Sequence, residues 1–433
     1  MAADQVYERL VSGAVKLAVV GLGYVGLPLA AEFAKHVSVL GFDINSGRVE
    51  SLRSRLETVS SLEFTDNPDR LKEAGCFIIA VPTPVDQNRK PDLGCLLEAS
   101  RLVGSQLQPG SLVIFESTVY PGVTELLCAP VIEQVSGLMQ GQEWRLGYSP
   151  ERISPGDQEH SVAQVQKIIA GMDETTTREI QRIYELIIQA GVYPVSSIRT
   201  AEAAKVMENT QRDINIAFMN EMAMICHALK IDSAEVIKAM DTKWNALGFR
   251  PGLVGGHCIG VDPYYLLSAA REAGSDSLLI SLARSINEGM SDWILEQAVR
   301  ELTEAGTDPE SAQVLVLGIT FKENCPDCRN SKAADLVFRL QNAGMTVEVS
   351  DCLADPEAVR NEYGLNLVAL EKAAPADCVV VAVAHDQYGR MSPEAIADLF
   401  KPSLPAEKRL LMDVKSVFAP LGGSLPHCRY WSL

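Results

Sequence analysis

The chain has 433 residues, and at about 150 residues per domain this length predicts two or three domains. Its 56 acidic and 38 basic side chains give a net charge of −18, which disfavours nucleic acids and anionic membranes as partners because both attract basic surfaces. Hydrophobic residues make up 47% of the sequence, which excludes a globally disordered chain.

The sequence gives no sign of a membrane span or a secretion signal. No stretch approaches the roughly 18 uninterrupted apolar residues of a membrane helix. Residues 1–13 are polar and lack the apolar core and cleavage site of a signal peptide. Ten cysteines are too sparse for a disulfide scaffold, so we expect a cytoplasmic protein with reduced thiols. Cys325 and Cys328 have C-x-x-C spacing without a second pair or a histidine cluster, so we expect no metal site.

The first part of the chain alternates apolar strands with helical patterns. Lys16–Gly21 and Val37–Phe42 predict strands on either side of a helix over Leu27–His36. Two more apolar runs, Cys76–Val81 and Leu112–Glu116, are bounded by proline or glycine and also predict strands. Apolar runs of this length between helices are typical of a parallel sheet that is covered on both faces.

The middle of the chain has a different pattern. Ala201–Leu229 and Ser277–Leu302 have few helix breakers and a helical periodicity, so they predict long connecting helices and favour a dimer interface. The glycine-rich Gly252–Gly260 stretch and Pro263 predict a loop between them.

The last third returns to alternation of strands and helices. The predicted strands are Gln313–Gly318, Thr346–Ser350, Cys378–Ala384 and Leu410–Val414, with a helix at Ser331–Ala343. We therefore predict an α/β fold with two Rossmann-like doubly wound domains joined by a central long-helix region. The expected domain ranges are 1–200, 201–305 and 306–433.

A G-x-G-x-x-G motif follows the first predicted strand and opens a helix. It consists of Gly21, Gly23 and Gly26, with Tyr24 and Val25 between the last two. Asp43 lies 20 residues after Gly23, where a carboxylate binds the ribose 2′-hydroxyl and repels a 2′-phosphate. The motif predicts a dinucleotide site and favours NAD over NADP. Arg48 is a complication, since arginine can pair with a 2′-phosphate.

A thiol lies among small residues in Gly255–Asp262. Because a helix is expected to follow it, Cys258 is a candidate nucleophile activated by the helix dipole. Asp262 is placed to orient water or a general base. The alternative is a structural loop in which the cysteine has no chemical role.

Other polar residues follow strands or share a helix face. Lys205 and Asn209 are separated by four residues, so they lie on one helix face and can stabilise an oxyanion; a solvated face is the alternative. Thr83 and Thr118 follow predicted strands, where α/β sheets bind ligands. Glu151 and Arg152 belong to a further polar segment.

Together, these segments resemble the nucleotide-sugar 6-dehydrogenase family, whose members oxidise UDP-glucose, GDP-mannose or UDP-N-acetylhexosamines. The resemblance extends from Lys16 to about Ser416. The segments that carry it are GLGYVGLPLA, VPTPVD, ESTVYPG, YSPERISPGD, AEAAKVMENTQRDINIAFMNE, FRPGLVGGHCIGVDPYYL and GITFKENCPDCRNSK. The chain looks most similar to the bacterial and archaeal UDP-N-acetylhexosamine enzymes, which supply capsule and O-antigen synthesis.

The resemblance implies a four-electron oxidation of a C6 alcohol to a carboxylate, with two NAD reduced and one water consumed. It makes Cys258 the nucleophile that forms a thiohemiacetal and then a thioester. Lys205 and Asn209 match the positions that hold the C6 oxyanion, and Asp262 matches the carboxylate that positions water. Glu151 matches a candidate base, and Thr118 a residue near the reacting carbon and the cofactor.

The resemblance also implies the substrate and cofactor contacts. The positions that match substrate-binding residues are Glu151, Arg152, Lys205, Asn209, Arg250, Gly255, Phe321, Lys322 and Lys415. Arg329 and Thr83 match positions near NAD. Arg250 reaches the neighbouring active site in many relatives, so a homodimer is expected. Cys328 departs from the family pattern without altering Lys322 or Arg329.

The resemblance assigns NAD to the N-terminal domain and the UDP-sugar to the C-terminal domain. It leaves open the C2 substituent and C4 stereochemistry of the sugar, so UDP-glucose or GDP-mannose is the alternative substrate. A non-enzymatic nucleotide-sensing protein would be expected to lose Cys258, Lys205 or Asp262. A two-electron dehydrogenase with a similar plan would not need the cysteine.

Overall fold

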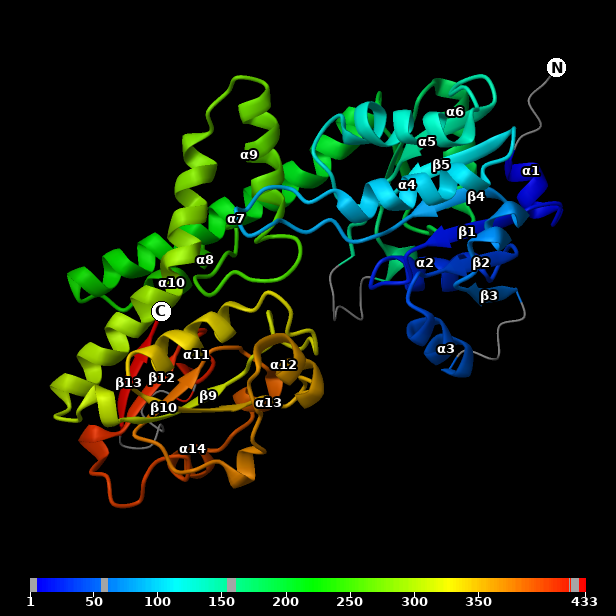
Figure 1. Cartoon of the computed structure of the whole chain (residues 1–433). Coiled ribbons are helices and arrows are strands. Elements are labelled where there is room, and N and C mark those ends of the chain that lie inside the picture. The colour runs from blue at the N-terminus through cyan, green and yellow to red at the C-terminus, as the bar shows by residue number, and fades with distance from the viewer. Residues whose placement is uncertain (1–5, 56–60, 154–160, 420, 422–427) are drawn as a thin grey trace. The chain divides into compact units, whose positions relative to one another are not determined.

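The computed structural model describes residues 6–55, 61–153, 161–419, 421 and 428–433 (Figure 1). The chain divides into two compact units, which are described separately below. The first unit contains Met1–Glu208 and Tyr264–Asp276, and the second contains Asn209–Pro263 and Ser277–Leu433. Among the helices of the described residues, none is long and apolar enough to cross a membrane.

The first unit is built on one sheet with the strand order β3-β2-β1-β4-β5-β6-β7-β8. Its strands are β1 (Lys16–Val20), β2 (Val39–Phe42), β3 (Leu62–Thr65), β4 (Ala74–Ile79), β5 (Ser111–Phe115), β6 (Trp144–Tyr148), β7 (Lys167–Gly171) and β8 (Val192–Pro194). Strands β1 to β6 are parallel and have the order of dinucleotide-binding folds, with the reversal between β1 and β4. Strand β7 is antiparallel to β6, which the sequence pattern did not indicate.

Helices cover both faces of this sheet, as Figure 1 shows. Leu17 and Val19 pack in one core with α1, α2, α3 and α6, whereas Ala18 and Val20 pack in another with α4, α5 and the start of α7. This alternation follows from the pleat, which sends successive side chains to opposite faces. The helices are α1 (Val6–Val11), α2 (Gly26–Phe33), α3 (Ser46–Arg55), α4 (Gly94–Gln106), α5 (Ala129–Ser136), α6 (Glu174–Glu185) and α7 (Ile198–Leu229), which belongs to the second unit from Asn209 onward.

The second unit contains a parallel sheet with the order β10-β9-β11-β12-β13. Its strands are β9 (Gln313–Leu317), β10 (Thr346–Ser350), β11 (Cys378–Val381), β12 (Leu410–Asp413) and β13 (Arg429–Ser432). Val314 and Val316 pack with α10 and α11, whereas Leu315 and Leu317 pack with α13 and α14. The helices are α8 (Ser233–Asp241), α9 (Asp262–Glu272), which begins in this unit, α10 (Leu278–Glu304), α11 (Lys332–Asn342), α12 (Pro356–Tyr363), α13 (Asp386–Gly389) and α14 (Pro393–Ala397).

The predicted fold class is confirmed, because both sheets are parallel over most of their width and have a helical core on each face. The predicted long helices are α7 and α10. All ten cysteines are free thiols, and six of them are buried. Cys95 is exposed, and Cys258, Cys352 and Cys428 are partly exposed.

Candidate active site

The glycine-rich loop lies where the strand order reverses, between β1 and α2. Gly21 has a φ of +94°, and a Cβ on it would lie 2.8 Å from the carbonyl oxygen of Ala80. A Cβ on Gly26 would lie 1.9 Å from the carbonyl oxygen of Gly21. A Cβ on Gly23 would meet no atom within 4 Å. Two glycines therefore permit the tight turn, and the third leaves the loop open to a pyrophosphate.

The N-terminus of α2 suits an anion. Val25 is the cap residue and provides no side-chain capping hydrogen bond, so no side chain competes for this helix end. The hydroxyl of Tyr24 donates to the carbonyl oxygen of Ile153 at 3.0 Å, which fixes the loop to the segment after β6.

Asp43 follows β2 and is bound to the glycine loop. Its Oδ2 accepts from the backbone N–H of Leu22 at 3.0 Å, and its Oδ1 accepts from the N–H of Asn45 at 2.9 Å. Arg48 Nε donates to the carbonyl oxygen of Leu22 at 2.6 Å and lies 4.0 Å from Asp43 Oδ2. The loop, the helix end and this carboxylate together fit the pyrophosphate and ribose of NAD.

Two polar segments that follow strands lie side by side. Thr83 Oγ1 donates to the carbonyl oxygen of Thr118 at 2.7 Å, and Ser117 Oγ donates to that of Val81 at 2.7 Å. The Tyr265 hydroxyl donates to the Thr83 carbonyl oxygen at 2.9 Å. The carboxyl ends of β4 and β5 are therefore tied together where such sheets bind ligands.

Glu151 lies after β6 and is 8% exposed. Its Oε1 accepts from the backbone N–H groups of Arg152 and Ile153, each at 2.6 Å, and its Oε2 accepts from Lys167 Nζ at 3.3 Å. Burial acts to raise the pKa of Glu151, but Lys167, the two N–H groups and Lys205 outweigh it, so the pKa is lowered. Glu151 is thus a carboxylate at neutral pH, the form that accepts a proton.

Helix α7 carries Lys205 and Asn209 one turn apart, as the sequence predicted. Lys205 is 8% exposed, so it does not lie on a solvated face. The Arg152 guanidinium donates to Glu208 Oε2 at 3.1 Å and to the carbonyl oxygen of Gln166 at 3.2 Å, which holds it beside this helix.

Cys258 lies in the turn that leads into α9 and is partly exposed. Its carbonyl oxygen accepts from the N–H groups of Val261 and Asp262 at 3.0 and 2.8 Å. Asp262 Oδ2 accepts from Asn209 Nδ2 at 2.6 Å. The structure therefore joins Asn209 and Asp262 directly and places the thiol one turn before that carboxylate.

The loop around the thiol packs closely against the segment before α11. The Gly256 N–H donates to the Asn330 carbonyl oxygen at 2.9 Å, and Asn330 Nδ2 donates back to the Gly256 carbonyl oxygen at 2.7 Å. A Cβ on Gly255 would lie 2.5 Å from that Asn330 oxygen. A Cβ on Gly256, where φ is +83°, would lie 2.6 Å from the Phe321 ring. Neither glycine can be replaced without moving the loop.

The start of this loop is held by a buried polar network. Asn220 on α7 accepts from the Gly252 N–H at 2.7 Å and donates to its carbonyl oxygen at 3.1 Å. Asn220 Nδ2 also donates to Asn287 Oδ1 at 2.8 Å. Asp213 in turn accepts from Asn287 at 2.7 Å and from Arg284 at 2.6 Å. Sequence reasoning gave none of these side chains a role.

Asp327 lies between Arg329 and His257, the residue before Cys258. Its Oδ2 accepts from Arg329 Nη2 at 2.6 Å and lies 3.4 Å from His257 Nε2. Burial acts to raise the pKa of Asp327, but His257 and Arg329 hold it well below its usual range. Lys322 Nζ lies 5.9 Å from the centre of the ring of its neighbour in the chain, Phe321. Arg329 therefore has an acidic partner that the sequence did not reveal.

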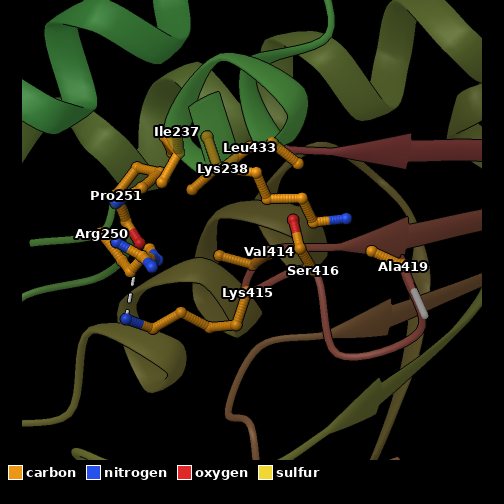
Figure 2. Close-up of a pocket in the computed structure, with 10 residues that line it drawn as sticks. Ile237, Lys238, Arg250, Pro251, Val414, Lys415, Ser416, Ala419 and Leu433 are labelled. Carbon is orange, nitrogen blue, oxygen red and sulfur yellow. Dashed lines mark hydrogen bonds between the residues drawn. The ribbon is translucent and has the colours of Figure 1, made fainter. Parts of the chain in front are cut away.

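A pocket of about 230 Å³ in the second unit brings Arg250 and Lys415 together (Figure 2). Arg250 pairs with Asp241, and Lys415 Nζ lies 3.5 Å from the carbonyl oxygen of Pro251. Lys238 also lines the pocket. Three cationic side chains at one cavity can bind phosphate groups despite the acidic character of the chain.

Asp351, Cys352 and His385 place potential metal-ligand atoms within 4.8 Å of one another. His385 Nδ1 accepts from the Asn324 N–H at 3.0 Å, and its Nε2 lies 3.3 Å from Asp351 Oδ2. Both ring nitrogens therefore take part in hydrogen bonds within the protein. These contacts tie the loops after β9, β10 and β11 together.

Three models of one family match successive parts of the chain. The NAD binding domain of the UDP-glucose/GDP-mannose dehydrogenase family matches residues 15–188. The central domain of the family matches residues 199–289, and its UDP binding domain matches residues 315–420.

Curated proteins and solved structures are similar over nearly the whole length. The chain is 46% identical over 398 residues to a UDP-N-acetyl-D-glucosamine 6-dehydrogenase from Pseudomonas aeruginosa, covering 89% of this chain and 94% of that protein. It is 44% identical over 414 residues to the same kind of protein from Salmonella typhi, with coverages of 93% and 96%. The structure of a UDP-D-ManNAc dehydrogenase from Pyrococcus horikoshii matches with a TM-score of 0.86 and 30% identity, covering 96% of this chain and 99% of that one.

The fold and the NAD binding domain define an NAD-dependent dehydrogenase. More specifically, the chain belongs to the UDP-glucose/GDP-mannose dehydrogenase family.

Proposed function

We propose that this chain oxidises the C6 hydroxyl of a UDP-N-acetylhexosamine to the uronate. The observation that carries the proposal is the arrangement of Asn209, Asp262 and Cys258 at the start of α9. The names of the two similar curated proteins support an N-acetylated sugar as the substrate. The uronate would be made in the cytoplasm and would serve as a precursor of surface polysaccharides.

The thiol supplies the covalent chemistry. The Cys258 thiolate adds to the C6 aldehyde and gives a thiohemiacetal, which is oxidised to a thioester and hydrolysed by water. Lys205 and Asn209 stabilise negative charge on the C6 oxygen. Asp262 positions water, Glu151 accepts a proton, and Thr118 lies near the reacting carbon and the cofactor.

The NAD site is formed by Gly21, Gly23, Tyr24, Val25, Gly26, Asp43, Arg48, Thr83, Thr118 and Arg329. Bound NAD accepts a hydride in each of the two oxidations, so two NADH accompany each uronate. Lys322 and Lys415 bind the diphosphate and uridine together with the partner subunit's Arg250, and Arg152, Gly255 and Phe321 complete the substrate site. We also propose a homodimer in which Arg250 serves the neighbouring site, with the central region at 201–305 as the interface.

The substrate is tested by measuring NADH formation with UDP-GlcNAc, UDP-GalNAc, their mannose-type isomer, UDP-glucose and GDP-mannose. Turnover of UDP-glucose or GDP-mannose alone would contradict the choice of an N-acetylated sugar. Binding without NADH formation for every sugar would favour a nucleotide-sensing protein. One NADH per product would indicate a two-electron dehydrogenase.

The covalent mechanism is tested with Cys258→Ser and Cys258→Ala. Both should abolish steady-state uronate formation, because serine is a much weaker nucleophile than cysteine at neutral pH and alanine has no nucleophilic group. Substrate binding should stay near the wild-type level. Cys95→Ser is the matched control, since Cys95 is an exposed thiol in the first unit. A Cys258→Ala protein that forms uronate at the wild-type rate, with two NADH per sugar, would refute the mechanism.

A further inference from the structure

A cluster of buried charges in the first unit is only partly used by the proposed function. Glu116 is 1% exposed, Lys167 3%, Tyr184 0% and Glu151 8%. Moving an ion into a protein interior costs several kcal/mol, and this cost is offset only by well-placed partners. Glu151 has a proposed role as a base, whereas the other three side chains have none.

Lys167 bridges the two carboxylates. Its Nζ lies 2.8 Å from Glu116 Oε2 and 3.3 Å from Glu151 Oε2. The second oxygen of Glu116 accepts from the Tyr184 hydroxyl, and Lys167 Nζ lies 5.4 Å from the centre of the Tyr184 ring. The second oxygen of Glu151 accepts two backbone N–H groups. All four carboxylate oxygens therefore have donors.

The antiparallel strand β7 creates this bridge. In the β6–β7 pair, Gly147 lies opposite Gly171 and Tyr148 opposite Ala170. Continuing this register beyond β6 brings Lys167, the first residue of β7, opposite Glu151. Glu116 directly follows β5, the neighbour of β6 in the sheet. A parallel β7 would have begun at the other edge, away from both carboxylates.

One ammonium cannot neutralise two buried carboxylates. Burial raises the pKa of Glu116 to about 7; Lys167 opposes this shift and the charge of Glu151 adds to it. The pKa of Glu151 is instead lowered, with Lys167 and Lys205 as the cations that face it. Glu116 therefore gains or loses the proton near neutral pH while Glu151 stays ionised.

We propose that Lys167 is the positioning residue that holds Glu151 ionised and fixed, and that Glu116 competes with Glu151 for this ammonium. This inference deepens the proposed function and rests on it for the role of Glu151 as a base. Protonation of Glu116 leaves the ammonium to Glu151 alone. The Tyr184 hydroxyl donates to the other oxygen of Glu116 and so fixes the position of the Glu116 side chain beside Lys167.

The first test follows the titration of Glu151 itself by NMR of protein labelled with ¹³C at the glutamate δ carbon. Glu151→Gln assigns the signal. The wild-type signal should show no titration between about pH 5 and pH 8, whereas Lys167→Met should shift the titration upward by about 1–3 units, into that window. Glu116→Gln should leave it unchanged, because Glu116 is already protonated at the lower pH where Glu151 titrates; an upward shift in this variant would contradict the competition.

The second test measures kcat/KM for UDP-GlcNAc against pH. Lys167→Met should move the acid limb upward, Glu116→Gln should not, and Lys167→Arg should restore most of the wild-type profile. A purely structural role would lower activity by the same factor at every pH. In Glu116→Gln/Lys167→Met no carboxylate is left at position 116 without the ammonium, so this double variant supplies the same comparison against Glu116→Gln if Lys167→Met does not fold.

The two proposals can fail separately. An unchanged Glu151 titration and an unmoved acid limb in Lys167→Met would overturn the role of Lys167. A shifted Glu151 titration in a protein whose wild type oxidises no sugar nucleotide would overturn the proposed function and leave the positioning of Glu151 by Lys167 intact.

Discussion

Asp43 is the residue from which we expect cofactor choice to follow. Its carboxylate is held against the glycine loop by the Leu22 N–H and would repel a 2′-phosphate. Asp43→Ala should weaken NAD binding about tenfold, a change of ~1.4 kcal/mol, and reduce the preference for NAD over NADP. Titration calorimetry with both cofactors measures these changes.

Asp69→Ala is the control for this substitution, since Asp69 is an exposed aspartate in the same unit with a weak partner at 3.6 Å. It should bind NAD as the wild type does. Equal affinity of the wild type for NAD and NADP would show that Asp43 does not discriminate, and Arg48 would then be the residue to examine.

Glu116 should give the stability of the protein a measurable pH dependence. Burial raises its pKa from 4.5 to about 7, so between these values the folded state holds a proton that the unfolded state releases. The contribution of Glu116 to stability is thus present at low pH and is lost as pH rises through about 7. Glu116→Gln should gain thermal stability relative to the wild type as pH rises from about 5 to 8, as differential scanning fluorimetry would measure. A difference in melting temperature that does not vary with pH would contradict this assignment.

At the scale of elements, the sequence predicts the strands that have a regular apolar pattern, but it does not predict the short strand β8 or the direction of β7. The strands β1, β2, β4 and β5 and the glycine loop can be predicted from the sequence, because buried strands require apolar runs and tight turns require glycines. Strand β8 has only three residues and ends at Pro194, so it has no alternating pattern to read. Strand β7 begins with Lys167, and nothing in a single strand's sequence specifies its direction. The bridge to Glu151 depends on that direction, which explains why it was missed.

In the candidate site, too, some residues could be predicted from the sequence and others could not. The resemblance to a family supplied the positions of Cys258, Asp262 and Asn209, and two of these are in contact. Asp327 is the partner of Arg329, and Asn330 is the partner of the thiol loop. Both lie in a turn before α11, whose backbone conformation cannot be predicted from a periodic sequence pattern. Such partners are set by tertiary packing and become visible only in the structure.

The attachment of the thiol loop to α7 gives a prediction about the loop as an element. Asn220→Ala removes both hydrogen bonds to Gly252 and leaves a buried N–H and carbonyl without partners, which costs about 1–3 kcal/mol. We expect lower kcat and weaker UDP-sugar binding with little change in NAD affinity. Asn215→Ala on the same helix is the control, because the Asn215 side chain donates within α7, to the Gln211 carbonyl oxygen. Equal losses in the two variants would show that α7, and not the loop, is affected.

At the scale of the whole molecule, the proposed homodimer can be tested by mixing two inactive variants. If Arg250 acts on the neighbouring site, a mixed dimer of Arg250→Ala and Cys258→Ala contains one intact site. Random exchange of subunits should then restore about a quarter of the wild-type activity. If Arg250 acts within its own chain, no activity returns. Sedimentation velocity on the wild type and on the mixture checks that dimers form.

Because most of its thiols are buried, we expect oxidants to react with only two cysteines of this protein. Burial raises the pKa of Cys128 to about 12 and that of Cys428 to about 11, and raises those of Cys76, Cys325, Cys328, Cys352 and Cys378 as well. Peroxide reacts with the thiolate, so these scaffold cysteines should be nearly inert, and Cys226 is buried. Cys258 and the exposed Cys95 are then the residues open to sulfenic acid formation. If Cys258 is the nucleophile as proposed, mild peroxide should abolish the activity of a Cys95→Ser protein through oxidation of Cys258, and a thiol reductant should restore it. Oxidative stress would then switch off the proposed uronate formation reversibly without damaging the fold.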